Sequence, residues 1–405
     1  MLFGKKIKGW FRFLKSKQKI YADYASTTPV LPEVIEAMEP FWHDSFFNPA
    51  AIYERAFSVK EKLSACRLKI ARILGGRESE IIFTGSGTEA DNLAILGVFE
   101  AAKQRGVKAP HIITTAFEHP AIIETCLEAE RRGATVTRLS VNEAGMINLS
   151  DLKAALTPET VLVAVIYANN EIGVIQPIKA VTRIVREYRR AQNSIYPYVH
   201  TDASQATNYL DIAVNKLGVD LMTLDGSKIY GPKGIGLLYL RHNTAIKPLL
   251  FGGGQEGGLR PGTENLALIV GFTEALTIVQ RDREAESARL IVLRDKVIKV
   301  LLSEFPEATL NGSSQERLPN NINICFPGLD AEFAVIKLDL AGIECSFATA
   351  CRTYKDESSS YVIEALGKRD CALSSLRLTL GRGTTEAETD QIIKLLDKTV
   401  KDLRQ

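Results

Sequence analysis

The chain has 405 residues with a formal net charge of +2, and 45% of its residues are hydrophobic and 24% charged. Its length allows two domains, or one large domain with a lobe, and its composition is that of an ordinary globular protein rather than a fibrous or disordered one. With 50 basic residues against 48 acidic ones it has no whole-chain footprint for nucleic acid, so we expect no direct nucleic-acid partner. No apolar run reaches the length of a membrane span.

Residues 1–19 form a basic N-terminal extension that differs from the rest of the chain. They contain seven lysines and arginines, no acidic residue, and interleaved aromatic residues such as Trp10 and Phe11. Two interpretations stay open. The segment is either an amphipathic helix in weak contact with a membrane surface or an acidic partner, or a solvated tail.

Six cysteines are scattered along the chain without a Cys-x-x-Cys pair, and no secretory signal is recognised. These features predict reduced thiols in a cytoplasmic protein. With five histidines and no paired Cys/His spacing, we expect no metal site.

Between residues 81 and 240, short apolar runs alternate with longer helical stretches such as 178–191. This alternation predicts an α/β fold with a mostly parallel sheet wrapped in helices. Ligands of such sheets gather at the carboxyl ends of the strands. The predicted strands are residues 81–84, 111–115, 135–139, 161–167, 198–202, 220–224 and 236–240.

A long charged helix is predicted from about residue 263 to 305, and it leads into a smaller α+β domain at the C-terminus. In that domain we predict a strand over 321–326, a helix over 330–341, and a capping box of Thr385 and Glu388 that opens the last helix. The predicted domains are therefore residues 20–262 and 263–405, and the first residues of the larger one border the small domain or the active site.

The segment from Ile81 to Glu89 runs from a strand through a glycine turn into a helix beginning near Thr88. Free backbone N–H groups and the helix dipole favour an anion there, and glycine allows its close approach. The segment therefore indicates a phosphate site, although an ordinary strand-to-helix turn has the same pattern.

Lys228 lies between a predicted buried strand and the turn residues Gly231, Pro232 and Gly234. A desolvated lysine near other cations has a lowered pKa, and it can hold a carbonyl cofactor such as pyridoxal phosphate as an imine. The alternative is a solvated lysine on a surface turn.

Three more strand ends carry polar side chains. Asp202 could keep a pyridinium nitrogen protonated, Asn170 could donate to a phenolic oxygen, and His119 could stack on a flat ring and shuttle protons. Their alternatives are a helix N-cap, a turn and a structural histidine. Because such groups coincide at five strand ends, we favour a catalytic site.

The chain from about residue 21 to the C-terminus resembles the cysteine desulfurases, which are pyridoxal-phosphate enzymes of the class V aminotransferase group with the type I fold. The resemblance implies a homodimer with sites at its interface, an imine at Lys228, and His119 stacked on the ring. The matching segments are residues 23–29, 47–49, 83–92, 118–119, 169–173, 202–205, 228–236, 252–256 and 260–263.

The resemblance also implies which residues contact the rest of the cofactor. Asp202 pairs with the ring nitrogen, and the phenolic oxygen has two amide partners. The phosphate is held within one subunit and by one residue of its neighbour. The implied partners of the phenolic oxygen are Asn170 and Gln205, and those of the phosphate are Gly87, Thr88, Ser227 and, from the neighbouring subunit, Thr263.

By the same resemblance, Cys351 is the nucleophile, in a loop where Ala348 and Thr349 replace the family's Gly and Ser. Its thiolate would attack the sulfur of L-cysteine and carry a persulfide to an acceptor. Cys351 could instead be a structural cysteine, a description that suits Cys345 better. Arg377 matches the arginine that binds the substrate carboxylate with its guanidinium fork, alongside Asn170.

The chain departs from the family before its lysine, where Asp225, Gly226 and Ser227 replace Ser or Thr, Gly and His. A carboxylate 4 Å from the phosphate would repel it by up to about 4 kcal/mol at an effective dielectric of 20. Asp225 therefore turns away, is protonated, or weakens cofactor binding. A second departure is at residues 50–53, which lack the family's Ser and His.

We therefore expect a homodimeric enzyme that converts L-cysteine to L-alanine and passes sulfur to an acceptor or an iron-sulfur scaffold protein, for iron-sulfur cluster assembly or tRNA thiolation. Two alternatives stay open. One is another enzyme of the same fold, such as a selenocysteine lyase, a β-lyase or an aminotransferase. The other is a non-catalytic homologue that acts as a binding subunit.

Overall fold

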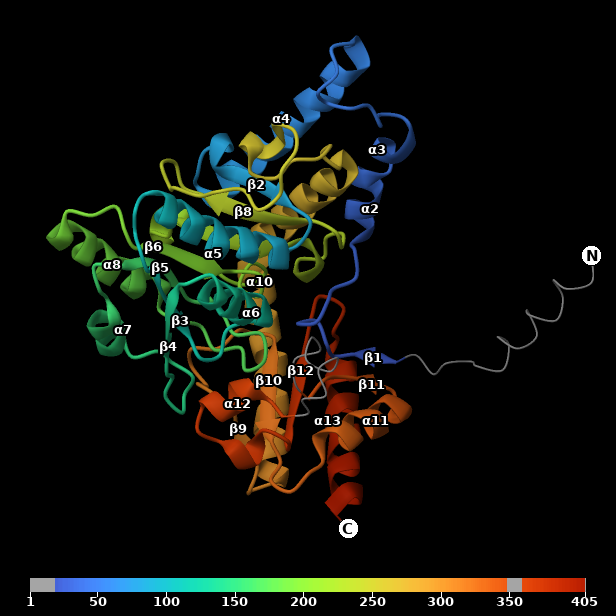
Figure 1. Cartoon of the computed structure of the whole chain (residues 1–405). Coiled ribbons are helices and arrows are strands. Elements are labelled where there is room, and N and C mark those ends of the chain that lie inside the picture. Colours follow the sequence, from blue (N-terminus) through green and yellow to red (C-terminus); the bar gives the residue numbers. More distant parts are fainter. Residues whose placement is uncertain (1–18, 348–358, 405) are drawn as a thin grey trace, which may run out of the picture.

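The computed structural model describes residues 19–347 and 359–404 (Figure 1). Its largest sheet has seven strands. The five strands from β7 to β4 run parallel, whereas β8 is antiparallel to both of its neighbours. The predicted α/β fold with a mostly parallel seven-stranded sheet is confirmed. The order across the sheet is β2 (Ile81–Thr84), β8 (Gly236–Leu240), β7 (Leu221–Asp225), β6 (Tyr198–Asp202), β5 (Thr160–Ala164), β3 (His111–Thr115) and β4 (Thr135–Leu139).

Five of the seven strands have the predicted bounds, and two are shifted. The strand predicted over 220–224 is one residue later, and the one predicted over 161–167 ends at Ala164. Beyond Ala164 the chain still follows β6, because Val165 and Tyr167 donate to the carbonyls of His200 and Asp202 at 3.1 and 2.9 Å. The apolar run is therefore longer than the regular pairing.

Helices cover both faces of this sheet, and the side chains of β5 show why. Leu162 belongs to the buried cluster that contains residues of α5 (Gly87–Gln104) and α6 (Pro120–Arg131). Val163 belongs to the cluster with residues of α8 (Ile178–Gln192) and α10 (Leu266–Glu304). Because successive side chains of a strand point to opposite faces, a continuous apolar run fills both cores.

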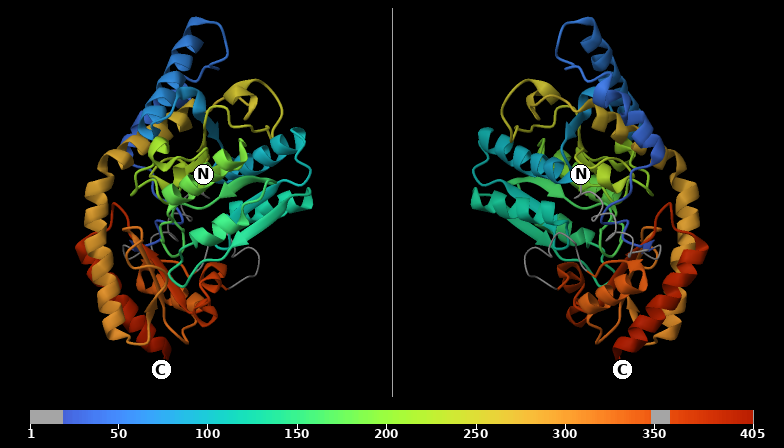
Figure 2. Two further views of the ribbon diagram at one scale, coloured as in Figure 1. Left: turned by 90° about the vertical axis from the view of Figure 1, so that its left-hand side faces the viewer. Right: turned by 90° about the vertical axis from the view of Figure 1, so that its right-hand side faces the viewer.

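The 39-residue helix α10 connects the large sheet with the smaller ones, and Figure 2 shows it along one whole side of the molecule. At its far end β10 (Asn321–Cys325) pairs antiparallel with β12 (Ser375–Thr379) and β9 (Thr309–Leu310), beside α11 (Ala331–Ala341) and α13 (Glu386–Arg404). The predicted capping box opens α13. The Thr385 N–H donates to Glu388 Oε2 at 2.8 Å, and the Glu388 N–H donates to Thr385 Oγ1 at 3.2 Å. The boundary at residue 262 stays a prediction.

The start of the described chain joins the smaller part, since β1 (Ile20–Tyr21) pairs in parallel with β11 (Ile343–Glu344). None of the helices within 19–347 and 359–404 combines the length and the apolarity that a membrane crossing needs. The remaining helices are α2 (Pro32–Met38), α3 (Pro40–His43), α4 (Glu54–Leu74), α7 (Leu149–Ala155), α9 (Val214–Leu217) and α12 (Tyr361–Ala365), with 3-10 turns η1 (Glu78–Glu80), η2 (Gly226–Lys228), η3 (Gln255–Gly258) and η5 (Arg369–Cys371).

The expectation that the cysteines are reduced is wrong for one pair, because Cys325 and Cys371 form a disulfide with 5.3 Å between their Cα atoms. The antiparallel register places Cys325 opposite Ser375, whose hydroxyl donates to the carbonyl of Cys371 at 2.6 Å. The two cysteines are 46 residues apart in the chain, so their spacing gave no sign of the pairing.

Candidate active site

A cavity lies at the edge of the large sheet where β2, β3, β5, β6 and β7 all end. These strands run in the same direction, so the residues that follow them meet at one edge. Many of the predicted site residues line this cavity together. Its lining consists of Gly87, Thr88, Asp91, His119, Ile166, Asn170, Asp202, Ser204, Gln205, Asp225 and Lys228.

Lys228 ends the short turn η2 after β7 and lines the cavity, so it does not lie on a solvated surface turn. Its ammonium group donates a hydrogen bond to the carbonyl of Ser26. Its own carbonyl accepts a hydrogen bond from the side-chain amide of Asn208 at 2.7 Å. These contacts tie the lysine to the segment before α2 and direct its amine to the site.

His119 begins α6, and its Nδ1 accepts a hydrogen bond from the N–H of Ala121 at 3.2 Å. Burial lowers the pKa of His119, the charge of Lys228 lowers it further, and Asp202 opposes both effects. The ring is therefore neutral near pH 7. Because Nδ1 is an acceptor, Nε2 carries the proton.

Asp202 ends β6, and its Oδ1 accepts the N–H of Ser204 at 2.9 Å. No helix begins there, so the N-cap alternative for Asp202 is wrong. Its carboxylate, the imidazole of His119 and the carboxylate of Asp91 each place one ligand atom within 4.8 Å of the others. Such a trio could hold a cation, but the resemblance assigns two of these side chains to a cofactor ring.

Asp91 was missed as a site residue. It lies four residues after Gly87 on α5, so both are on one face of the helix. It is buried, and its pKa is raised well above the usual range by burial and by the charge of Asp202. The one-turn spacing after the glycine turn was the signal that could have identified it.

Asn170 lines the cavity with an unsatisfied hydrogen-bond acceptor. The side chain is 8% exposed, and its Oδ1 has no hydrogen-bond partner. Its neighbour Asn169 instead holds the turn, since Oδ1 accepts the N–H groups of Glu171 and Ile172 at 2.9 and 3.0 Å. A buried polar atom without a partner costs about 1–3 kcal/mol, which a ligand would recover.

The anion end of the cavity is formed by the first turn of α5, and Asp225 occupies it. The N–H of Gly87 donates to Asp225 Oδ2 at 2.8 Å. The N–H and the hydroxyl of Ser227 both donate to Asp225 Oδ1, at 2.7 and 2.6 Å. The possibility that Asp225 turns away is therefore wrong, because its carboxylate points at the donors predicted for phosphate.

Gln205 also lines the cavity, and its Nε2 donates to the carbonyl of Ala25 at 2.8 Å. Of the predicted residues outside the lining, Thr263 is exposed.

Cys351 and residues 1–18 of the basic extension lie outside the described residues. The segment that precedes Cys351 starts beside Arg377, since the backbones of Ser346 and Arg377 exchange hydrogen bonds of 3.1 and 2.7 Å.

Arg377 lies on β12 next to the cavity rather than in its lining. It is 2% exposed, and its Nη1 donates to the carbonyl of Asn170 at 3.2 Å. Its Nη2 donates to Asp23 and Ser26, while its Nε has no hydrogen-bond partner. Of the five N–H donors of the guanidinium, three are used in these bonds, and the N–H at Nε is available to a ligand.

Comparison with known proteins agrees with this geometry. The model of the family Aminotransferase class-V matches residues 20–392. The protein named Cysteine desulfurase IscS from Dictyoglomus turgidum is 40% identical over 389 residues, which cover 96% of each chain. The chain belongs to the cysteine desulfurase family.

Solved structures of similar fold support this membership. A NifS-like protein superposes on this cysteine desulfurase family member with a TM-score of 0.87 at 31% identity, over 95% of this chain and all of the other. SspA in complex with cysteine superposes with a TM-score of 0.76 at 32% identity, over 89% of this chain and 98% of that one.

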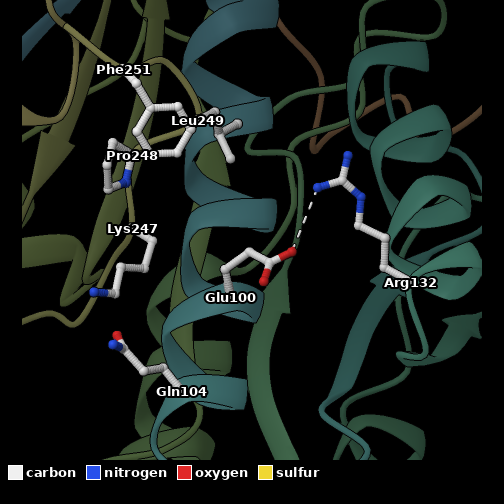
Figure 3. A pocket seen from close by; sticks show the side chains of 7 residues that line it. All are labelled: Glu100, Gln104, Arg132, Lys247, Pro248, Leu249 and Phe251. Atoms are coloured by element: carbon white, nitrogen blue, oxygen red, sulfur yellow. Dashed lines mark ion pairs between the residues drawn. The ribbon is translucent and has the colours of Figure 1, made fainter.

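The chain has a second, larger cavity of about 460 Å³, which lies between α5, the end of α6 and residues 247–251 (Figure 3). Its charged pair is Glu100 and Arg132, at 3.5 Å. Phe251 at its rim is 88% exposed. Its size exceeds that of the strand-end cavity, but its lining has no imidazole and only one carboxylate, which is paired with Arg132, so we assign the chemistry to the strand-end cavity.

Proposed function

We propose that the protein is a pyridoxal-phosphate-dependent cysteine desulfurase that converts L-cysteine to L-alanine and leaves the sulfur as a persulfide on Cys351. The observation that supports this most directly is the convergence of Lys228, His119, Asp202 and Asn170 on one cavity. The family membership supports the reaction, and the related SspA in complex with cysteine supports the substrate.

The residues of the cavity fit the ring end of this cofactor. The unsatisfied Oδ1 of Asn170 marks a place where a polar ligand atom belongs, and a side-chain amide can offer either its oxygen or its nitrogen. The neutral imidazole of His119 offers a flat face, and the carboxylate of Asp202 suits a protonated ring nitrogen. Lys228 supplies the amine for the aldehyde. The phosphate group fits only when the carboxylate of Asp225 moves away from the N–H of Gly87 and the two donors of Ser227.

When bound, the cofactor withdraws electrons from the α-carbon of the amino acid substrate. The chain supplies the other requirements. Arg377 offers its unpartnered Nε to the substrate carboxylate, and His119 holds a transferable proton at Nε2. The thiolate of Cys351 attacks the substrate sulfur as the carbon–sulfur bond breaks, and the electron pair of that bond stays with the β-carbon, which takes up a proton. Cysteine and the enzyme thiol thus become alanine and an enzyme persulfide, so all atoms balance.

The test is incubation of the protein with cysteine and a reductant, with alanine and sulfide as readouts. We expect both products from the native protein and almost none from Cys351→Ser. Cys345→Ser is the matched control, since burial raises the pKa of this thiol to about 12 and keeps it unreactive. Equal turnover by Cys351→Ser would refute the assignment and favour a lyase or an aminotransferase of the same fold.

We also propose a homodimer in the cytoplasm that passes its sulfur to an acceptor or an iron-sulfur scaffold protein. Apolar side chains exposed near the start of α4 support an interface, because a monomer rarely exposes a large apolar patch. Thr263 is exposed, as a contact with a neighbouring subunit requires. Light scattering after gel filtration tests the dimer, and Ile52→Asp should weaken it. The exposed apolar residues are Phe46 (65%), Ile52 (97%), Tyr53 (52%) and Phe57 (59%).

A further inference from the structure

The N-terminus of α5 binds an anion that the chain itself supplies. Asp225 ends β7 and lies 138 positions after Gly87, from whose N–H it accepts a hydrogen bond of 2.8 Å. Its other oxygen accepts both donors of Ser227. One carboxylate therefore spans the first N–H of the helix and the two donors that precede Lys228.

The side chain of Asp225 lies so close to Gly87 that little space remains between them. A Cβ atom placed on Gly87 would lie 3.1 Å from both Cβ and Oδ2 of Asp225, and 3.3 Å from Oγ of Ser204. A second anion cannot share the N–H of Gly87 while the carboxylate stays there. A further carboxylate, that of Asp202, lines the same cavity.

We propose that Asp225 is a specificity-determining residue that competes with the cofactor phosphate for Gly87 and Ser227, so that the phosphate adds little to cofactor affinity. The inference rests on the proposed function and deepens it. To receive the phosphate, the site must rotate Asp225 away, which breaks three hydrogen bonds and leaves two like charges near each other. The aldehyde ring has other proposed partners, namely Lys228, His119 and Asn170, and none of them accepts or donates one of these three hydrogen bonds.

The test compares two aldehydes that differ only in the phosphate group. Cofactor-free protein is titrated with pyridoxal phosphate and, separately, with pyridoxal, and the absorbance band of the covalent adduct at Lys228 gives each dissociation constant. For the native protein we expect less than a tenfold preference for the phosphorylated compound. For Asp225→Ser, which exchanges the carboxylate for a hydroxyl donor, we expect the preference to rise at least tenfold, which corresponds to about 1.4 kcal/mol.

Two further variants separate charge from shape. Asp225→Asn keeps an acceptor for the N–H of Gly87 but removes the charge, so we expect an intermediate rise, and it serves if Asp225→Ser does not fold. Asp211→Asn removes a carboxylate that pairs with Lys216 outside the cavity, and we expect no change in preference. Inorganic phosphate should raise the melting temperature of Asp225→Ser and leave that of the native protein unchanged.

The failures of the two proposals can be told apart. If the native protein prefers pyridoxal phosphate by more than a hundredfold and the Asp225 variants do not change this ratio, competition by Asp225 is refuted while the cofactor assignment stands. If neither aldehyde forms an adduct with any variant, the proposed function fails. The melting temperatures with inorganic phosphate then still decide whether Asp225 blocks the anion site.

Discussion

The guanidinium of Arg377 is paired with the carboxylate of Asp23, with 2.7 Å between Nη2 and Oδ1. The same Nη2 donates to the hydroxyl of Ser26 at 2.8 Å, and the carbonyl of Ser26 accepts from Lys228. Ser26 therefore connects the proposed carboxylate-binding arginine with the proposed cofactor lysine. The segment between β1 and α2 positions both charged groups at once.

Replacement of Arg377 by lysine keeps the charge but removes the planar fork. We expect the KM for cysteine to rise by about 10- to 100-fold, because a hydrogen bond to a charged group contributes about 1.5–3 kcal/mol. The absorbance of the bound cofactor should be unchanged, since Arg377 does not line the cavity. Arg382→Lys, five residues further on, is the control and should leave KM unchanged. An unaltered KM in Arg377→Lys would remove this residue from substrate binding.

Glu118 makes stability depend on pH. Burial raises the pKa of its carboxyl to about 8, although hydrogen bonds from Ile166 and Thr115 oppose the shift. Between the unfolded pKa near 4.5 and the folded pKa near 8, the folded state keeps a proton that the unfolded state has lost. Glu118 therefore contributes stability below about pH 4.5 that is lost as the pH rises towards 8, by at most about 1.4 kcal/mol per pH unit.

The measurement is the free energy of unfolding in urea at several pH values from 5 to 8.5. We expect Glu118→Gln, which has the same shape and no ionisable group, to lose less stability than the native protein as the pH rises. Glu143→Gln is the control, because Glu143 is exposed. Parallel curves for the native protein and Glu118→Gln would show that Glu118 is already ionised when folded.

The strands could be predicted from the sequence because their apolar runs are short and end at turn residues. The cavity followed from them, since parallel strands place their carboxyl ends at one edge. The polar residues at the ends of β3, β5, β6 and β7 were therefore expected near each other, and His119, Asn170, Asp202 and Lys228 line one cavity.

The orientation of Asp225 could not be predicted in the same way. It depends on a hydrogen bond to Gly87, which β2 brings close to β7 through the intervening strand β8. The disulfide likewise depends on the register of β10 and β12, which places Cys371 beside Cys325. Both features arise from packing between distant segments, so local sequence patterns contain no sign of them.

A buried ion pair between Arg67 and Glu256 holds the glycine-rich segment 252–258 beside the large sheet. The two groups form a fork, with distances of 2.9 and 2.7 Å, and Glu256 also accepts the N–H of Phe83 at 2.9 Å. We expect Glu256→Gln to lower the free energy of unfolding by about 3–5 kcal/mol, because it leaves Arg67, whose side chain is only 18% exposed, without its counter-charge. Glu274→Gln breaks the more exposed pair with Lys69 and should cost less than about 1 kcal/mol. Similar losses in urea for the two variants would contradict this assignment.

The disulfide closes a loop of 46 residues between Cys325 and Cys371, and this loop contains Cys351. Cross-linking a loop of this length restricts the unfolded chain, and we expect the bond to contribute roughly 4 kcal/mol to stability. Urea unfolding of the native protein should therefore shift to lower urea after reduction, while a Cys325→Ser/Cys371→Ser variant should not respond to the reductant. Alkylation of the unfolded, unreduced protein should leave these two thiols unmodified. If both were alkylated, the bond would be absent in solution and the native protein would unfold at the same urea concentration with and without reductant.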